Sequence, residues 1–300
     1  MLTGIHLILT YTCNFECDHC FLYCSPRSEG TCSFAMIKDL LDDLQTIATV
    51  DSVGFEGGEP FLFYPLLLES VREAAERGFH TAIQTNAYWA VNEQDAGLWL
   101  DPLKQAGLEI LEVSDDTFHH GDTGGDTPAK HAAAAALKVG LEVDSICIQP
   151  PAVQERKPGT RGKPIYMGGP KMRGRAVDKL ADGLPVKPWE TFTACPLEDL
   201  RNPGRVHIDA LGNVHLCQGL CMGNIGTQSL SSLIKSYDPD THPVCGPILK
   251  GGPAQLARQY SLDHESGYVD ACHLCTSLCK GLLDRFPGHL APRQVYGLDG

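Results

Sequence analysis

Residues 5–20 read IHLILTYTCNFECDHC, an apolar run followed by three closely spaced cysteines. The apolar run is short and continuous, which predicts a first β-strand. Cys13, Cys17 and Cys20 follow it at C-x3-C-x2-C spacing. Three thiolates on a short loop can bind three irons of a four-iron four-sulfur cluster, because cysteine sulfur is the usual protein ligand of such clusters. The fourth iron would remain open to a small molecule, whereas a zinc site is the alternative for this spacing taken alone.

The chain has 300 residues, of which 43% are hydrophobic. This size suits one large α/β domain, or a barrel-like domain with a small appendage. No apolar run reaches the roughly 18 residues that a membrane span requires. The start of the chain has neither a basic region nor a cleavage site, so we expect no signal peptide. We therefore expect a cytoplasmic protein that does not associate with a membrane.

The cysteine content also bears on location, since 13 cysteines are many for a chain without an expected secretory signal. An odd number in clustered spacings is typical of metal sites and does not suit a complete disulfide framework. Thiolate-bound clusters need a reducing compartment, which again favours the cytoplasm. The cysteines outside any tight spacing are expected to be buried, inert thiols: Cys24, Cys32, Cys147 and Cys245.

The charge of the chain limits its partners. The formal net charge is −13. Proteins that bind nucleic acid usually carry a basic patch, so we expect no nucleic-acid partner and disfavour RNA modification as the function.

Short apolar runs alternate with amphipathic stretches over the first half of the chain. The runs predict strands at 5–9, 51–56, 79–84, 108–113 and 141–148. Helical spacing and capping residues predict helices at 34–48, from Pro65 to Arg77, up to Gly107 and from Thr127 to Gly140, with Ser33 as the first N-cap. This alternation predicts an α/β fold with a parallel sheet, and the number of units suggests a complete or partial (β/α) barrel.

Polar or glycine-rich segments directly follow the predicted strands. After the cysteine triplet come Gly57-Gly58-Glu59-Pro60, then Asn86, and then Ser114 with Asp116. In (β/α) barrels this face carries the active site. Two glycines let the main chain approach a ligand closely, and the carboxylate of Glu59 suits an ammonium group. The simpler alternatives are a solvated loop carboxylate for Glu59 and a turn former for Asn86.

These separated matches together resemble the radical S-adenosylmethionine (SAM) superfamily, which carries a cysteine triplet after strand one and a GGEP segment after strand two. The resemblance implies a partial (β/α)6 TIM-like barrel, with a four-iron four-sulfur cluster on Cys13, Cys17 and Cys20 and SAM at the open iron. It also implies a set of SAM contacts: His19 near the adenine, Gly57, Gly58, Glu59 and Pro60 at the amino group, Asn86 and Ser114 at the ribose and carboxylate, and Asp116. A loop histidine whose hydrogen bonds are satisfied within the protein is the alternative for His19.

The resemblance also implies the reaction type. The reduced cluster passes one electron to SAM, which is cleaved to methionine and a 5′-deoxyadenosyl radical, and this radical abstracts a hydrogen atom from an unactivated carbon. The protein then has to position the substrate and exclude water and oxygen. An electron donor such as a flavodoxin or ferredoxin is the implied partner.

Beyond the first half, proline, glycine and basic residues dominate residues 150–188, which we interpret as the end of the barrel and a linker. Residues 206–217 then read as a β-hairpin joined at 211–213. Further cysteines follow this linker at Cys195, at Cys217 in a G-x4-C unit, and at Cys272, Cys275 and Cys279. This pattern resembles the auxiliary-cluster extension called SPASM, or its shorter form, Twitch, and Gly174-Arg175-Ala176 is common in the same subgroup.

The second resemblance implies a small cysteine-rich β-hairpin/α C-terminal domain over residues 186–300, after a radical SAM core over 1–185. The last cysteines stand at C-x2-C-x3-C spacing, shorter than the full SPASM pattern, so we expect one auxiliary four-iron four-sulfur cluster. The expected ligands are Cys195, Cys217, Cys272 and Cys275; Cys279 could replace one of the last pair, and Cys221 is a further candidate outside the set. A closed zinc site is the alternative.

The leading hypothesis is therefore a radical SAM oxidoreductase or maturase that acts on a peptide or a small metabolite, with no catalytic residue assigned beyond the clusters. The auxiliary cluster would accept an electron from the substrate radical, in an oxidation or a cross-link formation, or would bind the substrate directly; we prefer electron transfer. The alternative function is a non-catalytic iron–sulfur or zinc scaffold or sensor. Glu59 and the glycine pair discriminate between the two, because a scaffold needs no SAM pocket.

Overall fold

The structure is a computed structural model that describes residues 2–122, 125–154, 165–167 and 169–298. Its centre is an eight-stranded sheet in the order β11-β10-β9-β1-β2-β3-β4-β5. The first five strands are parallel to one another: β1 (Gly4–Thr10), β2 (Ser52–Gly57), β3 (His80–Thr85), β4 (Ile110–Ser114) and β5 (Glu142–Ile146). These strands confirm the predicted α/β class and the five predicted apolar runs, with boundaries that differ by one or two residues.

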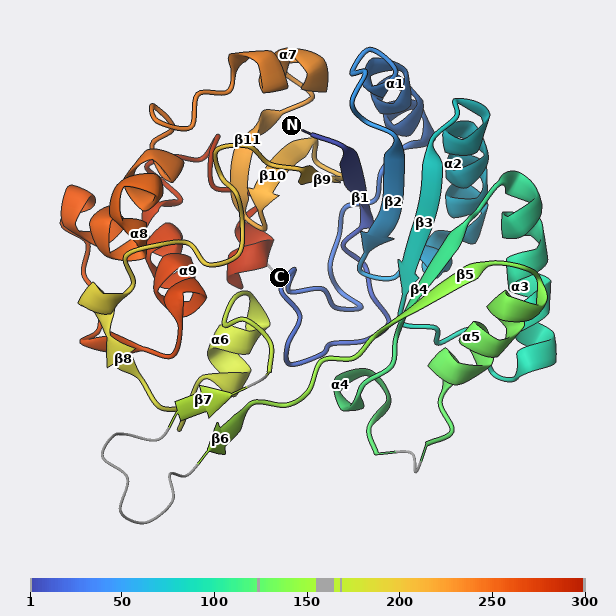
Figure 1. The fold of residues 1–300 in the computed structure, drawn as a ribbon, viewed down its shortest axis with the longest axis horizontal. Helices are drawn as coiled ribbons and strands as arrows, with labels where there is room; N and C mark the ends of the chain where they lie inside the picture. Colours follow the sequence, from blue (N-terminus) through green and yellow to red (C-terminus); the bar gives the residue numbers. More distant parts are fainter. Residues whose placement is uncertain (1, 123–124, 155–164, 168, 299–300) are drawn as a thin grey trace.

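Four helices cover the outer face of the parallel strands (Figure 1). They are α1 (Phe34–Leu44), α2 (Tyr64–Glu76), α3 (Glu93–Ala106) and α5 (Pro128–Lys138). Ser33 caps α1 as predicted, since its side chain accepts a hydrogen bond from Met36 N. Gly107 ends α3 at a φ of 106°, a left-handed conformation that glycine adopts without strain. Strands inside and helices outside confirm a partial barrel.

The predicted β-hairpin is present, and it belongs to the same sheet as the first half. β9 (Arg205–Asp209) pairs parallel to β1, and β10 (Asn213–Cys217) and β11 (Leu220–Asn224) continue the sheet antiparallel. The sixth parallel strand therefore comes from the C-terminal third and lies beside β1. After β5, the chain forms the two-stranded antiparallel sheet of β6 (Ala152–Gln154) and β7 (Ile165–Met167). Part of the expected linker, residues 155–164 and 168, lies outside the described residues.

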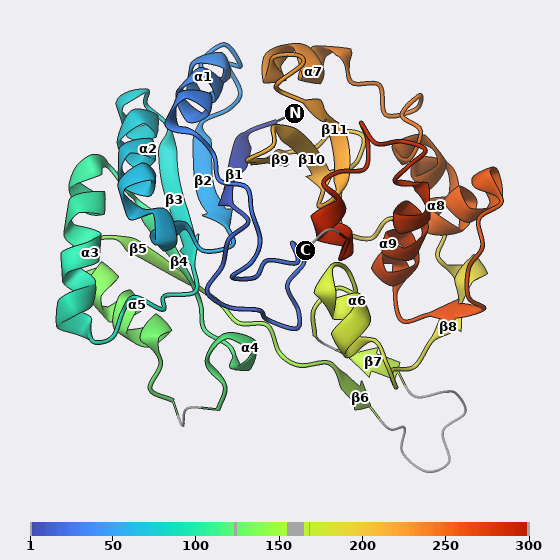
Figure 2. The same cartoon turned by 180° about the vertical axis from the view of Figure 1, so that it is seen from behind.

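The remaining elements are mainly helices: α6 (Arg175–Leu180), α7 (Leu230–Ser236), α8 (Cys245–Tyr260) and α9 (Ala271–Leu282), with a short pair of strands, β8 (Lys187–Pro188) and β12 (Gly267–Tyr268). α8 and α9 lie at the opposite end of the molecule from α3, whereas α7 lies beside α1 (Figures 1 and 2). α8 is kinked where Gly251 and Gly252 leave helical geometry before Pro253. No helix in the described part of the chain is long and apolar enough to cross a membrane.

β1 lies at the centre of the core, because it is paired on both edges and covered by helices. Ile5, Leu7 and Leu9 are each at most 1% exposed. Strands buried in this way are apolar almost without interruption, which explains why the opening run of the sequence was easy to predict. The loop that follows this strand is therefore attached to one of the most deeply buried parts of the fold.

Candidate functional site

A cavity lies at the carboxyl ends of the parallel strands, where the sequence predicted the site. The described residues that line it include Cys13, Cys17, His19, Cys20, Gly57, Gly58, Asn86, Ser114, Asp116 and His119. The structure thus brings the cysteine triplet together with all the predicted SAM contacts except Glu59 and Pro60. Both residues are buried, and Glu59 contacts the lining residues Thr85 and Asn86 from behind the cavity wall.

The backbone of the cysteine loop is turned toward the sulfur atoms. Phe15 N donates to Cys13 Sγ at 3.4 Å, and Cys24 N donates to Cys20 Sγ at 3.3 Å. Burial raises the pKa of the Cys13 and Cys17 thiols to about 12, while hydrogen bonds from Cys24 lower the pKa of Cys20 to about 6. A metal that binds Cys13 and Cys17 must therefore displace their protons, as it does at thiolate sites in general.

Arg175, the first residue of α6, holds this loop in place. Its backbone N donates to Cys20 O at 2.9 Å, and its guanidinium donates to Cys17 O at 2.9 Å and to Cys24 O at 2.7 Å. The side chain is only 4% exposed. Gly174 before it has a φ of 58°, and an added Cβ would overlap the carbonyl oxygen of Cys20. The Gly-Arg-Ala segment was noted in the sequence only as a subgroup feature, so this clamp was missed.

The glycine pair lets two loops approach each other backbone to backbone. Gly58 N donates to Thr10 O at 2.7 Å, and Glu59 N donates to Thr12 O at 3.0 Å. A Cβ on Gly58 would overlap the Thr12 carbonyl, and a Cβ on Gly57, where φ is 138°, would overlap that of Thr10. The glycines were predicted to admit a ligand. They line the cavity, and they are also required for the contact between the β1 and β2 loops.

The position of Glu59 differs from the prediction. Its carboxylate is fully buried and accepts hydrogen bonds from Phe61 N at 3.0 Å, Thr85 Oγ1 at 2.8 Å and Asn86 N at 2.8 Å. Burial raises its pKa to about 7, against the effect of these donors. The alternative of a solvated loop carboxylate is wrong, because no part of the residue is exposed. In this conformation the carboxylate positions Asn86, and a direct contact with SAM stays a prediction.

A small aromatic and acidic group forms another wall of the cavity. Asp116 begins the short helix α4 (Thr117–His120) and accepts from Phe118 N at 3.0 Å and from His119 Nδ1 at 2.8 Å. His19 packs on Phe118 with ring centroids 4.6 Å apart. Neither α4 nor His119 was predicted, although Asp116 followed by a polar segment is a possible helix start.

His19 supports the idea that this cavity binds a cofactor. Burial lowers its pKa to about 4, so the ring is neutral at pH 7. Its Nδ1 atom is buried and has no hydrogen-bond partner among the described residues. A buried nitrogen without a partner costs free energy unless a ligand satisfies it. Three thiols beside such a nitrogen fit a thiolate-bound cluster together with a ligand that has polar atoms.

A second cavity is lined by five cysteines from the second half of the chain. The lining residues include Cys195, Cys217, Cys272, Cys275 and Cys279, which are all the predicted auxiliary ligands. Cys221 lies elsewhere: it is fully buried, and its Sγ donates to Ala291 O at 3.3 Å. The structure therefore separates Cys221 from the set and leaves Cys275 and Cys279 side by side on α9 as alternatives.

Arg173 faces this second set, two residues before the arginine that clamps the first. Its Nη1 donates to Cys217 Sγ at 3.3 Å and lies 3.8 Å from Glu198 Oε1. A guanidinium beside a sulfur stabilises the thiolate form, which is the form that binds metal. Sequence reasoning gave Arg173 no role, and only the fold shows that it reaches the sulfur.

A protein-family model matches most of the first half of the chain. Residues 7–151, which contain β1 to β5 and the cysteine triplet, match the model of the Radical SAM superfamily. The match supports assignment of this part of the chain to the radical SAM superfamily.

Curated relatives match over a similar region. The chain is 32% identical over 115 residues to an S-adenosylmethionine-dependent nucleotide dehydratase of Selenomonas ruminantium, which is 38% of this chain and 39% of that protein. It is 24% identical over 115 residues, 38% of this chain, to the putative peptide biosynthesis protein YydG of Bacillus subtilis (strain 168), covering 36% of the relative. The matches thus cover little more than a third of each relative.

Among solved structures, BtrN in complex with AdoMet and 2-DOIA has a TM-score of 0.47 and 18% identity, covering 78% of this chain and 82% of that one. Native anSMEcpe with bound AdoMet has the same TM-score, 0.47, with 14% identity, and covers 96% of this chain and 98% of that one.

Proposed function

We propose that this chain is a radical SAM enzyme that binds a four-iron four-sulfur cluster through Cys13, Cys17 and Cys20. The observation that carries the proposal is the convergence of these three thiols with the Gly57-Gly58 backbone in one cavity. When bound, the cluster and SAM would supply one-electron cleavage and hydrogen abstraction from a substrate carbon.

The residues of the cavity then have distinct tasks. Gly57 and Gly58 bring main-chain atoms to the cavity wall, and Asn86 and Ser114 offer polar side chains at the ends of β3 and β4. His19 offers its unpartnered Nδ1 to a polar atom of the ligand. The remaining members of the predicted set support the wall: Asp116 by ordering α4, Glu59 by holding Asn86, and Pro60 by beginning the 3-10 turn Pro60–Phe63.

We also propose one auxiliary four-iron four-sulfur cluster on Cys195, Cys217, Cys272 and Cys275, with Cys279 as the alternative to one of the last two. This proposal is supported by the meeting of all five thiols at the second cavity. Arg173 supplies a positive charge at Cys217, which favours the reduced, more negative state of a bound cluster. Such an arrangement suits an electron acceptor in a substrate oxidation or cross-link formation.

The domain division we propose is a radical SAM core over residues 1–185 and an auxiliary-cluster domain over 186–300. The parallel pairing of β9 with β1 joins the two parts in one sheet. For the substrate we propose a peptide or a small molecule, in keeping with the named activities of the matched relatives. A flavodoxin or ferredoxin would be the electron donor, and the reducing cytoplasm would suit the 13 free cysteines.

Iron and sulfide content after anaerobic reconstitution tests both cluster sites. About eight irons per chain would support two four-iron clusters, whereas about four would mean that only one of the two sites binds a cluster. The triple substitution of Cys13, Cys17 and Cys20 by alanine should retain about four irons and form no 5′-deoxyadenosine from SAM. Cys272→Ala with Cys275→Ala should also retain about four irons but still cleave SAM. Cleavage of SAM by the triple variant would refute the proposed function.

The same measurements on the unsubstituted protein distinguish an enzyme from a scaffold or sensor. A scaffold or sensor would bind iron without forming 5′-deoxyadenosine in the presence of a strong reductant. A zinc site in the second cavity would show as about four irons and one zinc per chain, with sulfur ligands around the zinc. Absorption spectroscopy at the zinc edge distinguishes that result from iron loss during preparation.

A further inference from the structure

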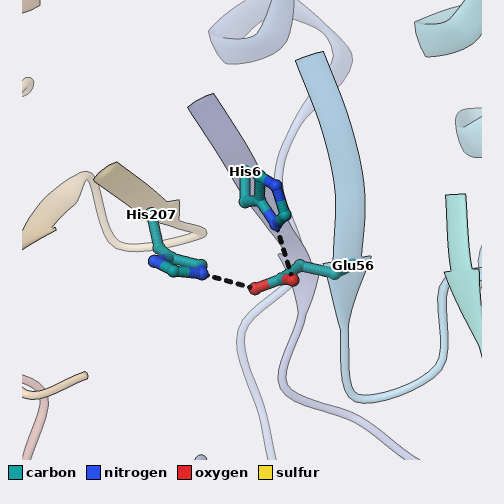
Figure 3. A group of neighbouring side chains, drawn as sticks. All are labelled: His6, Glu56 and His207. Carbon is teal, nitrogen blue, oxygen red and sulfur yellow. Dashed lines mark hydrogen bonds and ion pairs between the residues drawn. The ribbon is translucent and has the colours of Figure 1, made fainter. Parts of the chain in front are cut away.

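Inside the barrel, beside the cavity of the first cysteine set, three side chains of types that can bind metal meet from three neighbouring strands. His6 comes from β1, Glu56 from β2 and His207 from β9, and Figure 3 shows all three pointing toward one another. The two histidines are direct register partners across the β1–β9 pair. One ligand atom of each residue lies within 4.8 Å of the others.

Each carboxylate oxygen of Glu56 lies close to a different histidine of the group. Glu56 Oε2 lies 2.9 Å from His6 Nδ1, and Glu56 Oε1 lies 3.2 Å from His207 Nε2. The second contact is not a hydrogen bond, and Oε1 is a buried atom without a hydrogen-bond partner among the described residues. Glu56 is 5% exposed and His207 is 8% exposed. A buried carboxylate oxygen that accepts no hydrogen bond needs another form of compensation, and a cation supplies it.

The surrounding strands leave room for this arrangement. Gly54 on β2 lies beneath the His6 ring, and an added Cβ would be 3.2 Å from His6 Cδ2. A larger residue at this position would push the ring away from Glu56. Glu56 also lines the cavity of the first cysteine set, so the group borders that cavity from within the barrel.

We propose that His6, Glu56 and His207 bind a divalent transition-metal ion of the zinc type inside the barrel. Two imidazole nitrogens and one carboxylate are a ligand set that zinc commonly takes, with one coordination position left open. In tetrahedral zinc sites the ligand atoms lie about 3.3 Å apart, as follows from bonds of about 2.0–2.2 Å. The two contacts of Glu56, 2.9 Å and 3.2 Å, are close to that value, and the ligand atoms of His6 and His207 lie within 4.8 Å of each other. The open position would accept an oxygen donor, from water or from a hydroxyl or carboxylate group of a molecule in the adjoining cavity.

A second group, His19, Asp116 and His119, offers similar atoms. It belongs to the cavity of the cysteine triplet, and its carboxylate already accepts backbone hydrogen bonds. The interior group is distinct from it because its carboxylate is not satisfied in this way.

The test uses the full chain with its iron–sulfur clusters reconstituted, incubated with Zn²⁺ and then dialysed against a weak chelator. We expect about one retained zinc per chain, whose X-ray absorption shows nitrogen and oxygen ligands with imidazole scattering and no sulfur. His207→Asn and Glu56→Gln should each weaken Zn²⁺ binding by at least about 10-fold. The matched control is His80→Asn, because His80 and Glu109 form an exposed pair at 2.8 Å with no third ligand among the described residues.

No retained zinc in the unsubstituted protein, a sulfur shell around it, or equal binding by all three variants would overturn the proposal. The spectrum of the unsubstituted protein decides the ligand type even where a variant does not fold. The result is independent of the proposed radical chemistry, since formation of 5′-deoxyadenosine and zinc binding are measured separately.

Discussion

The carboxylate of Glu59 accepts a hydrogen bond from the backbone amide of Asn86 over 2.8 Å, which ties the loop after β2 to the loop after β3. The same carboxylate also accepts from Phe61 N and Thr85 Oγ1. Two loops that carry predicted SAM contacts are therefore held by one fully buried acid. Its surroundings make the acid a structural element of the site.

Glu59→Gln tests this tie. The glutamine side chain keeps one acceptor oxygen but replaces the other with an NH₂ group, which then faces a hydrogen-bond donor of the protein. We therefore expect the free energy of unfolding to fall by about 1–3 kcal/mol. Thermal unfolding of the anaerobic protein measures it. Glu109→Gln on the surface should change stability by less than about 0.5 kcal/mol. Equal stability of Glu59→Gln and the unsubstituted protein would mean that the buried hydrogen bonds are not formed.

Gly58→Ala tests the approach of the β1 and β2 loops. Its Cβ would overlap the Thr12 carbonyl, so the GGEP loop has to move away from the cysteine triplet. We expect reduced iron content and loss of 5′-deoxyadenosine formation. Gly97→Ala in α3 is the control, because nothing lies within 4 Å of its Cβ position, and this change should stabilise the helix by about 0.5–1 kcal/mol. Full activity of Gly58→Ala would show that the loop contact is dispensable.

Arg175→Met removes the two guanidinium hydrogen bonds to Cys17 O and Cys24 O. One buried and one partly buried carbonyl lose charge-assisted donors, and we expect destabilisation of about 2–4 kcal/mol together with faster loss of iron from the first site. Iron release to a chelator over time is the measurement. Arg201→Met removes an exposed pair with Asp240 and should leave the release rate unchanged. An unchanged rate in Arg175→Met would contradict the clamp.

Arg173→Met should act on the second cysteine set alone. Loss of a positive charge and a hydrogen bond at Cys217 Sγ disfavours the reduced state of a bound cluster. We expect a more negative potential for that centre, on the order of 40 mV for a differential interaction of about 1 kcal/mol. Redox titration followed by electron paramagnetic resonance measures the shift. A shift confined to the first centre would be inconsistent with the placement of Arg173.

His242 predicts a dependence of stability on pH. Burial lowers its pKa to about 4, and its Nδ1 accepts from Val244 N and Cys245 N at the start of α8. Between pH 4 and about 6.5 the unfolded chain therefore binds one more proton here, so stability falls as the pH falls through this window. The advantage of the unsubstituted protein over His242→Asn should be about 1 kcal/mol smaller at pH 5.5 than at pH 7.5. A difference that stays constant over this range would show that His242 titrates normally.

Much of the first half could be predicted from sequence because its signals are local. The buried strands are apolar runs, Ser33 and Gly107 mark helix ends, and the cysteines lie close together in the chain. The meeting of Asn86 and Ser114 with the triplet could be predicted as well, since parallel strands end at one face. For these residues, their position at the end of a strand was enough to predict that they line the same cavity.

Interactions between distant segments could not be predicted in this way. His207 lies beside His6 only because β9 joins the edge of β1, a pairing across about 200 residues that no periodicity encodes. The inward turn of Glu59 depends on Thr85, and the role of Arg175 depends on how α6 packs on the cysteine loop. In each case the partner, and not the residue type, determines the function of the side chain.

Arg173, Gly174 and Arg175 form one continuous stretch of backbone between the two cysteine cavities. Arg173 contacts a sulfur of the second set, while Arg175 holds the loop of the first. Gly174 fits against the carbonyl of Cys20 with no space for a side chain. The residue that lines the second cavity is therefore separated by one glycine from the residue that holds the loop of the first. The two cysteine cavities thus share one short segment of wall, although their cysteines lie far apart in the sequence.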